Sequence, residues 1–175
     1  MAVILHLANT VALLERARSV REQVFTIEKQ IPKSIEVDEL DCLNDACDHF
    51  VVEIKDAKEL GELQEAVVGT KPQEMDAVLC QTMDVCALRC KKIDEKTIQL
   101  QRFCVMQDYR KTGVGRWVLE QIEDYYWKKG VEMITLDAKF RVSEFYEKCG
   151  YLVVSEPFIE ADVLHVVMEK RRGQE

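Results

Sequence analysis

The chain has 175 residues, of which 47% are hydrophobic and 32% are charged, a composition typical of one folded domain rather than of a disordered segment. Its 24 Lys and Arg against 32 Asp and Glu give a formal net charge of −8, which argues against nucleic acid as a partner. Residues 1–14 lack the basic and apolar regions of a secretory signal, and no run approaches the ~18 apolar residues of a membrane span. We therefore expect a cytoplasmic protein without membrane contact.

The seven cysteines are an odd number in a chain without a signal, which favours reduced thiols over disulfides. Neither the pair Cys42 and Cys47 nor the pair Cys86 and Cys90 has Cys-x-x-Cys spacing. No histidine pair stands near them in the sequence, so we expect no metal site.

Residues 2–7 are predicted to form a strand. Thr10 then suits the N-cap of a helix that runs to about residue 28. The buried stripe of this helix is predicted at helical spacing, at Val11, Leu14, Ala17, Val20 (or Arg21), Val24 and Ile27.

Residues 55–82 stand apart from the strands and helices predicted for the rest of the chain. Residues 58–68 are predicted to form an amphipathic helix, and the Gly and Pro of residues 69–72 end it. We expect a surface insertion within a single domain of residues 1–175, and the alternative is a partner-binding arm.

Residues 83–91 and 97–106 are predicted to form an antiparallel hairpin around the polar turn 93–96. The second strand leads into the loop of residues 110–116, after which apolar residues recur at helical spacing to about residue 129. Strands at 131–136, 151–154 and 163–169 and a short helix at 141–149 complete a mixed α/β pattern.

The loop of residues 110–116 has the composition of an anion site. Gly113 and Gly115 permit a tight turn and close approach to a ligand, and the first amides of the following helix have no intrahelical partner. Those amides attract anions, and Arg110, Lys111 and Arg116 add positive charge that suits phosphate oxygens. A phosphate-bearing ligand is therefore expected.

Two nucleotide motifs do not fit this loop. A P-loop requires Gly-Lys-Ser/Thr, whereas Gly115 is followed by Arg116 and Trp117. A dinucleotide fingerprint requires a third glycine where Val118 stands.

The segment from Arg110 to Gly115 fits the Arg/Gln-x-x-Gly-x-Gly/Ala signature with which GNAT N-acetyltransferases hold the pyrophosphate of acetyl-CoA. Residues 144–151, Glu-Phe-Tyr-Glu-Lys-Cys-Gly-Tyr, resemble the Phe-Tyr-x-Lys-x-Gly-Phe/Tyr segment of the same superfamily. Residues 20–41 resemble the Val-Phe…Glu-Gln…Pro…Asp-Glu-x-Asp opening of a group of small single-domain GNAT proteins, and residues 48–52 and 156–170 are similar to further segments of that group.

This resemblance implies the GNAT fold, an α/β (α+β) fold with a mixed, mostly antiparallel sheet of about six or seven strands, splayed at the fourth and fifth strands and flanked by about four helices. It implies acetyl-CoA as co-substrate, with the pantetheine arm on the backbone of Phe103, Cys104 and Val105. It places Lys139 near the pantetheine or phosphate arm and Tyr146 near the thioester. The implied pyrophosphate contacts are Arg110, Lys111, Thr112, Gly113, Val114, Gly115 and Arg116.

The resemblance also implies that the Tyr146 hydroxyl gives a proton to the departing thiolate, a role that suits a weakly acidic phenol. The general base stays open, because Gln99 and Gln101 stand where many superfamily members carry a glutamate. The catalytic candidates for this base are Glu39 and His165, and Asp41 and His49 are further acidic or imidazole candidates.

For the acceptor, we expect binding by Asp41, Arg89 and Arg102, although the two arginines could equally pair with structural carboxylates. Asp137 and Lys139 could form a local ion pair. Cys104 as a nucleophile is the less favoured alternative, since no histidine is close in sequence to activate it.

The predicted function is acetyl-CoA-dependent N-acetyl transfer, directly to the amine of a small acceptor. Carboxylates of residues 36–41 would attract a cationic amine. The alternative is an acyl-CoA-binding regulatory or interaction module without turnover, and a homodimer is left open.

Overall fold

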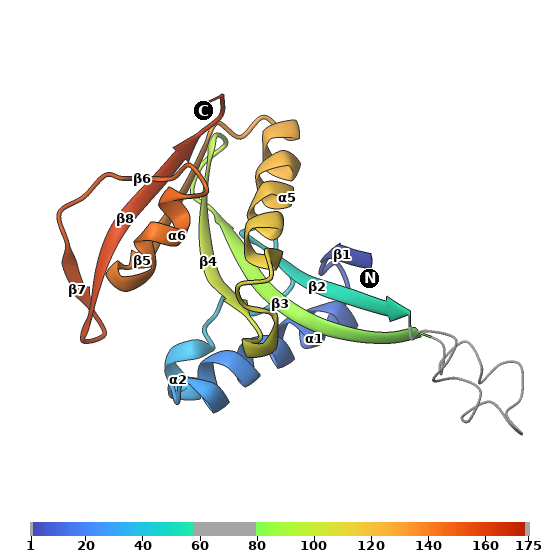
Figure 1. The fold of residues 1–175 in the computed structure, drawn as a ribbon. Helices are drawn as coiled ribbons and strands as arrows, with labels where there is room; N and C mark the ends of the chain where they lie inside the picture. The colour runs from blue at the N-terminus through green and yellow to red at the C-terminus, as the bar shows by residue number, and fades with distance from the viewer. Residues whose placement is uncertain (1, 58–79, 174–175) are drawn as a thin grey trace, which may run out of the picture.

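The computed structural model describes residues 2–57 and 80–173, which form one mixed sheet with helices on both faces (Figure 1). The helix predicted at residues 58–68 and the breaker at 69–72 lie outside the described residues.

The described strands pair in the order β1-β2-β3-β4-β5-β8-β6, with β7 also on β8. β4 and β5 run parallel, and the other neighbours run antiparallel. The predicted fold class is confirmed, with eight described strands in place of six or seven because β7 was not predicted. The strand bounds are β1 Ala2–Leu7, β2 Cys47–Ala57, β3 Cys80–Lys92, β4 Thr97–Val105, β5 Met133–Lys139, β6 Leu152–Val153, β7 Phe158–Glu160 and β8 Val163–Arg171.

The first helix begins as predicted, since the Thr10 side chain accepts a hydrogen bond from the Leu13 amide at 3.3 Å. It continues beyond its α-helical part as a π-helical segment over Glu22–Glu28. The α-helices of the described chain are α1 Val11–Arg21, α2 Lys33–Glu36, α5 Val114–Lys128 and α6 Ser143–Glu147.

The predicted stripe of the first helix is confirmed in its centre and wrong at its ends. Leu14, Ala17, Val20 and Val24 are buried, whereas Val11 and Ile27 are 68% and 60% exposed. Val11 is the first residue of α1, where the helix has only begun to cross the sheet. Ile27 lies in the π-helical segment, whose wider turns move residues off a stripe spaced at 3.6 residues.

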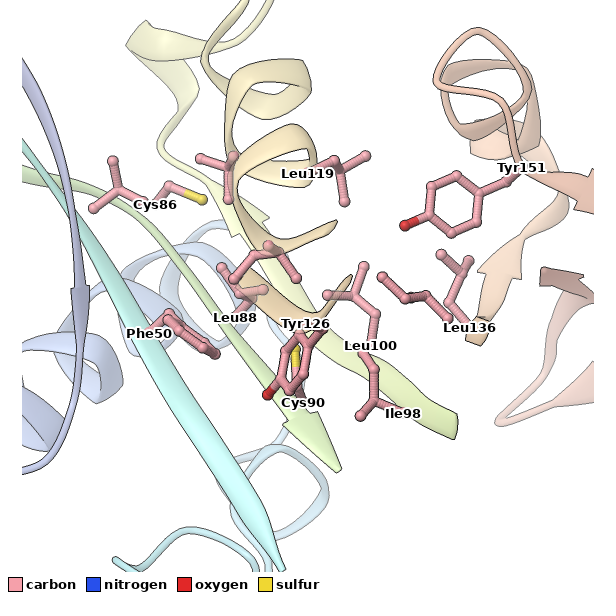
Figure 2. Packing of buried hydrophobic residues seen from close by; sticks show 14 of the residues in the cluster. Phe50, Cys86, Leu88, Cys90, Ile98, Leu100, Leu119, Tyr126, Leu136 and Tyr151 are labelled. Atoms are coloured by element: carbon pink, nitrogen blue, oxygen red, sulfur yellow. The ribbon is translucent and has the colours of Figure 1, made fainter. Parts of the chain in front are cut away.

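Two clusters of buried side chains hold the helices to the sheet. One lies between the sheet and α5 and includes Leu100, Leu119, Tyr126 and Leu136 (Figure 2). The other lies under α1 and includes Ala17, Val20, Val24, Ala87 and Cys104. α1 and α5 therefore cover opposite faces of the central strands.

A β-bulge in β4 changes which side chains face each helix. Arg89 of β3 lies opposite Gln101, but Ala87 lies opposite Cys104, so β4 carries one extra residue between these pairs. The bulge coincides with Arg102, whose φ is 53°. As a result both Leu100 and Phe103 pack on the α5 side, although they are an odd number of residues apart.

Candidate functional site

The two central parallel strands separate just after they meet. Their pairing is confined to Thr97–Met133, Ile98–Ile134 and Gln99–Thr135, whereas β5 stays paired with β8 through Lys139 (Figure 1). The splay expected at the fourth and fifth strands is therefore confirmed, and it opens a gap along the second half of β4. The strand predicted at 131–136 is displaced along the chain, since β5 begins at Met133 and ends at Lys139.

Backbone alternation decides which residues of β4 face this gap. The Met106 amide donates to the Val85 carbonyl of β3 at 2.8 Å, so the backbone groups of Cys104 and Met106 point toward β3. Those of Phe103 and Val105 then point toward the gap. Cys104 is buried and its pKa is raised to about 12 by desolvation, which makes its thiol a poor nucleophile.

The loop after β4 ends at the amino terminus of α5, which adjoins the same gap. Gly113 is the N-cap residue with φ +95°, a conformation that favours glycine, and no side chain caps this helix. At Gly115 a Cβ would lie 3.3 Å from the Phe145 ring, so any larger residue there would require that ring to shift by a few tenths of an ångström. Lys111 and Arg116 are exposed beside these amides, and the Thr112 hydroxyl donates to the Tyr109 carbonyl at 2.7 Å.

Arg110 occupies a different position from its neighbours in the loop. Its Nε donates to the Val105 carbonyl at 3.0 Å, and its terminal nitrogens pair with the Glu28 carboxylate, with one contact at 2.7 Å. The hydrogen bond from Arg110 lowers the pKa of Glu28. Arg110 therefore ties the first helical segment to β4, while Lys111 and Arg116 are the loop cations left at the surface.

Tyr146 projects from α6 onto the α5 side of the gap. Its ring lies 6.5 Å from that of Phe103 of β4 and 5.9 Å from that of Tyr151, centroid to centroid. Burial raises the pKa of the Tyr146 hydroxyl, so it stays protonated across the physiological range and can act as a proton donor.

Under α1, a buried ion cluster organises the loop between α2 and β2. Arg21 is 1% exposed and pairs with Glu36 and Asp41. Arg89 is also buried and holds Asp38 through two hydrogen bonds, at 2.6 and 2.5 Å. Burial alone would raise the pKa of Asp41, but its hydrogen bonds and the charge of Arg21 lower it to about 2.

Arg102 completes this arrangement by donating to the Ile35 and Glu36 carbonyls, each at 3.1 Å. Asp41, Arg89 and Arg102, predicted to bind the acceptor, are thus all engaged in holding the loop. Their substrate-binding role stays a prediction. The contacts of Arg89 and Arg102 match the alternative, in which the arginines pair with structural carboxylates.

The candidates for the general base lie on separate elements. Glu39 is exposed in the α2–β2 loop. His49 of β2 is buried, its Nε2 lies 2.8 Å from the Leu40 carbonyl, and burial lowers its pKa. His165 of β8 is buried with its Nδ1 2.8 Å from the Val163 carbonyl, and its ring stacks on that of Phe158.

Asp137, a polar residue beside the gap, was not among the catalytic residues predicted from the sequence. Asp137 of β5 is exposed and accepts a hydrogen bond from Gln99 Nε2 at 2.9 Å. The ion pair predicted between Asp137 and Lys139 is not formed, because this carboxylate turns toward β4 instead. Period-two alternation through Ile134, Leu136 and Ala138, which are buried, would have placed Asp137 on the opposite face.

Within residues 2–57 and 80–173, no group of three His, Cys, Asp or Glu side chains is placed to hold a metal ion. The helices of that described part are all too short or too polar to cross a membrane.

Comparison with known proteins places these features in a family. A family model described as an acetyltransferase (GNAT) domain matches residues 73–172. The uncharacterized N-acetyltransferase YjcF of Bacillus subtilis (strain 168) is 30% identical over 158 residues, covering 90% of this chain and 91% of YjcF. The uncharacterized protein YyaT of the same strain is 27% identical over 162 residues, covering 93% and 91%.

Solved structures share the fold. A Lactobacillus plantarum protein has a TM-score of 0.76 at 23% identity, covering 98% of this chain and 99% of its own. An acyl-CoA N-acyltransferase from Pseudomonas aeruginosa has a TM-score of 0.67 at 20% identity, covering 97% and 99%. At these identities the likeness shows the fold alone. Since the family model matches more than half of the residues and YjcF is similar along nearly the whole length, the chain belongs to the GNAT acetyltransferase domain family.

Proposed function

We propose that this protein is an acetyl-CoA-dependent N-acetyltransferase that transfers the acetyl group directly to the amine of a small acceptor. The observation that carries the proposal is the gap between β4 and β5, bordered by the uncapped amino terminus of α5 and by Tyr146. An uncapped helix terminus, an unpaired strand edge and a protonated phenol near one another suit a thioester joined to a diphosphate.

The proposed cofactor contacts follow from that layout. The amides of Val114, Gly115 and Arg116 and the side chains of Lys111 and Arg116 hold the pyrophosphate, since helix N-terminal amides and cations both favour phosphate oxygens. The backbone groups of Phe103 and the amide of Val105, whose carbonyl already accepts from Arg110, bind the pantetheine amides, much as an added strand would. Lys139, whose pKa is lowered by burial and by Arg141, sits at the end of β5 on the rim of the gap.

In the proposed reaction the acceptor nitrogen attacks the thioester carbonyl carbon, forming a C–N bond, and the C–S bond then breaks. Tyr146 gives its hydroxyl proton to the departing sulphur, and the proton that the nitrogen loses as the amide forms restores the Tyr146 hydroxyl by way of solvent. Coenzyme A and the N-acetylated amine are the products.

Fewer carboxylates of the α2–β2 loop are available to attract a cationic acceptor than the sequence alone indicates. Arg21, Arg89 and Arg102 neutralise most of the carboxylate charge of residues 36–41, and Glu39 is the loop carboxylate that stays exposed. We propose that the acceptor is a small cationic amine attracted by Glu39 together with Asp137 and Glu160. Membership of the narrower group with the Val-Phe…Glu-Gln opening stays a prediction.

Thiol release from acetyl-CoA tests this function. The purified chain is mixed with acetyl-CoA and a panel of primary amines comprising monoamines, polyamines, amino acids and a phosphorylated amino sugar. We expect saturable, amine-dependent release of free thiol, greatest with the cationic amines. Saturable binding of acetyl-CoA without thiol release on any amine would contradict the proposed N-acetyltransferase activity. It would support the alternative of an acyl-CoA-binding module without turnover.

A further inference from the structure

A continuous chain of polar side chains crosses the sheet from the buried ion cluster to the gap. Arg89, held by Asp38, donates from Nε to the Gln101 side-chain carbonyl at 3.0 Å. The Gln101 amide donates to the Gln99 carbonyl at 2.8 Å, and the Gln99 amide donates to Asp137 at 2.9 Å. Each glutamine side chain in this series is oriented by the donor that precedes it. The Gln99 side chain therefore presents its N–H group to the Asp137 carboxylate.

The position of Asp137 relative to the gap follows from strand register. Gln99 pairs with Thr135 in the parallel β4–β5 ladder, so two residues further along Asp137 is level with Gln101 and the bulge of β4. That is the point at which the two strands have just parted. Asp137 therefore stands at the narrow end of the gap.

Asp137 and Tyr146 lie on opposite faces of the sheet. Leu136 and Ala138 pack in the cluster under α5, as Tyr146 does, so the alternating side chain of Asp137 points to the α1 face. A group lying in the gap would have the phenol on one side and the carboxylate on the other. In a transfer without a covalent enzyme intermediate, the attacking nitrogen and the leaving sulphur need separate proton acceptors and donors, and this arrangement supplies both.

The charges around Asp137 favour a cation next to it. Burial raises the pKa of Asp137, and the negative charge of Glu160 of β7 raises it further. His165 of β8 lowers it. Lys139 lies two residues along the same strand and makes no ion pair with it, and the β4 neighbour, Gln99, is neutral. A carboxylate whose pKa is raised is a stronger base than an ordinary aspartate, and in its ionised form it can both pair with an ammonium group and take its proton.

We propose that Asp137 is the residue that receives the acceptor, first pairing with its ammonium group and then accepting its proton, with Gln99 and Gln101 as positioning residues. The inference rests on the proposed N-acetyl transfer. The ammonium N–H bond breaks and the proton moves to the Asp137 carboxylate, which leaves a neutral nitrogen lone pair to attack the thioester carbon. The proton then passes from Asp137 to solvent.

Glu39 and His165 are less suited to this role. Glu39 has no hydrogen bond that fixes its side chain among the described residues. His165 is buried and its ring is stacked on that of Phe158, so, although donation from Nδ1 to the Val163 carbonyl leaves Nε2 as the basic nitrogen, this side chain is enclosed where Asp137 is exposed. Asp137 combines exposure to the acceptor side with an orienting donor.

The decisive variant is Asp137→Asn, because an asparagine still accepts from Gln99 but cannot take a proton at neutral pH. With the best amine of the panel, we expect kcat/KM to fall by about 100-fold or more, with the Kd for acetyl-CoA within about twofold of wild type. The matched control is Asp124→Asn, an exposed aspartate of α5 paired with Lys128, which should retain wild-type rates.

The pH profile distinguishes a base from a structural residue. The carboxylate must be ionised to act, so wild-type kcat/KM should fall as pH drops through the raised pKa of Asp137. In Asp137→Asn the rate should instead follow the free amine fraction, rising about tenfold per pH unit below the pKa of the amine. Hydroxylamine, which is largely neutral at pH 7, should lose far less rate in this variant than an ordinary amine.

Gln99→Leu tests positioning: we expect kcat to fall about 10-fold with the shape of the pH profile kept. Wild-type rates and pH dependence in Asp137→Asn, with Tyr146→Phe still impaired, would overturn the assignment of Asp137 and leave acetyl transfer standing. A wild-type chain that binds acetyl-CoA and acetylates no amine would overturn both.

Discussion

Replacing Tyr146 by phenylalanine will lower kcat by about 100-fold while changing the Kd for acetyl-CoA by less than about threefold. In the proposed reaction the hydroxyl is the proton source for the departing thiolate, and losing a positioned acid costs about 10²–10⁴ in rate. The ring contacts with Phe103 and Tyr151 are kept by phenylalanine, so the packing of α6 against β4 is preserved. Thiol release under saturating amine measures kcat, and calorimetry measures the Kd.

The control for this variant is Tyr125→Phe. Tyr125 is also a partly buried tyrosine that packs against the core under α5, but it lies in the last turn of α5, away from the amino-terminal end that adjoins the gap. It should show wild-type kcat. Equal rates for Tyr146→Phe and wild type would remove the acid from the proposed mechanism.

Replacing Arg21 by methionine will lower the free energy of unfolding by about 3–5 kcal/mol, because Glu36 and Asp41 would stay buried without their principal cation. For a domain of this size such a loss lowers Tm by roughly 6–20 °C. Lys128→Met, which breaks an exposed ion pair with Asp124, should change stability by at most about 1 kcal/mol. Urea unfolding of the three proteins makes the comparison.

The effect of Arg21→Met should depend on pH in a definite direction. The pKa of Asp41 in the folded protein is about 2, below its ordinary value, so its ionisation stabilises the fold above about pH 4 and that contribution is lost as pH falls toward 2. The difference between wild type and Arg21→Met should therefore shrink on acidification. A difference that is constant from about pH 6 to pH 3 would mean that the ion pair with Asp41 is not the source of the lost stability.

Local chemistry in the sequence was sufficient to predict much of the fold. Thr10 caps a helix because its side chain meets an amide three residues away, and Gly113 marks a turn because few other residues adopt its φ. Signals of this kind depend on neighbours along the chain. They predicted the hairpin of β3 and β4, the loop after it and the start of α5.

Contacts between distant residues were not predictable in the same way. Arg110 pairs with Glu28, 82 residues away, and Arg89 with Asp38, 51 residues away, and both pairs depend on how strands and helices are stacked. The bulge at Arg102 also reverses which residues of β4 face each helix, and no simple alternation predicts it. Functional roles given to Arg110, Arg89 and Asp41 therefore rested on sequence position without knowledge of their partners.

Asp137 was missed for a more specific reason. The strand predicted at 131–136 stops one residue before it, so its side chain had no assigned face. The apolar alternation through Ala138 extends that strand, and with it Asp137 falls on the α1 face of the sheet.

Titration of coenzyme A into the purified chain, followed by calorimetry, tests the central claim, that the amino terminus of α5 and the adjoining gap bind this ligand. The two glycines at the ends of α5 form a matched pair for the test, since Gly113 and Gly130 have φ of +95° and +88° and a Cβ added at either would meet open space. Alanine at either position carries the same backbone strain, about 1–2 kcal/mol. We predict one saturable site in wild type, affinity lowered about tenfold in Gly113→Ala and unchanged affinity in Gly130→Ala. No uptake by wild type, or equal affinities in all three proteins, would contradict the account.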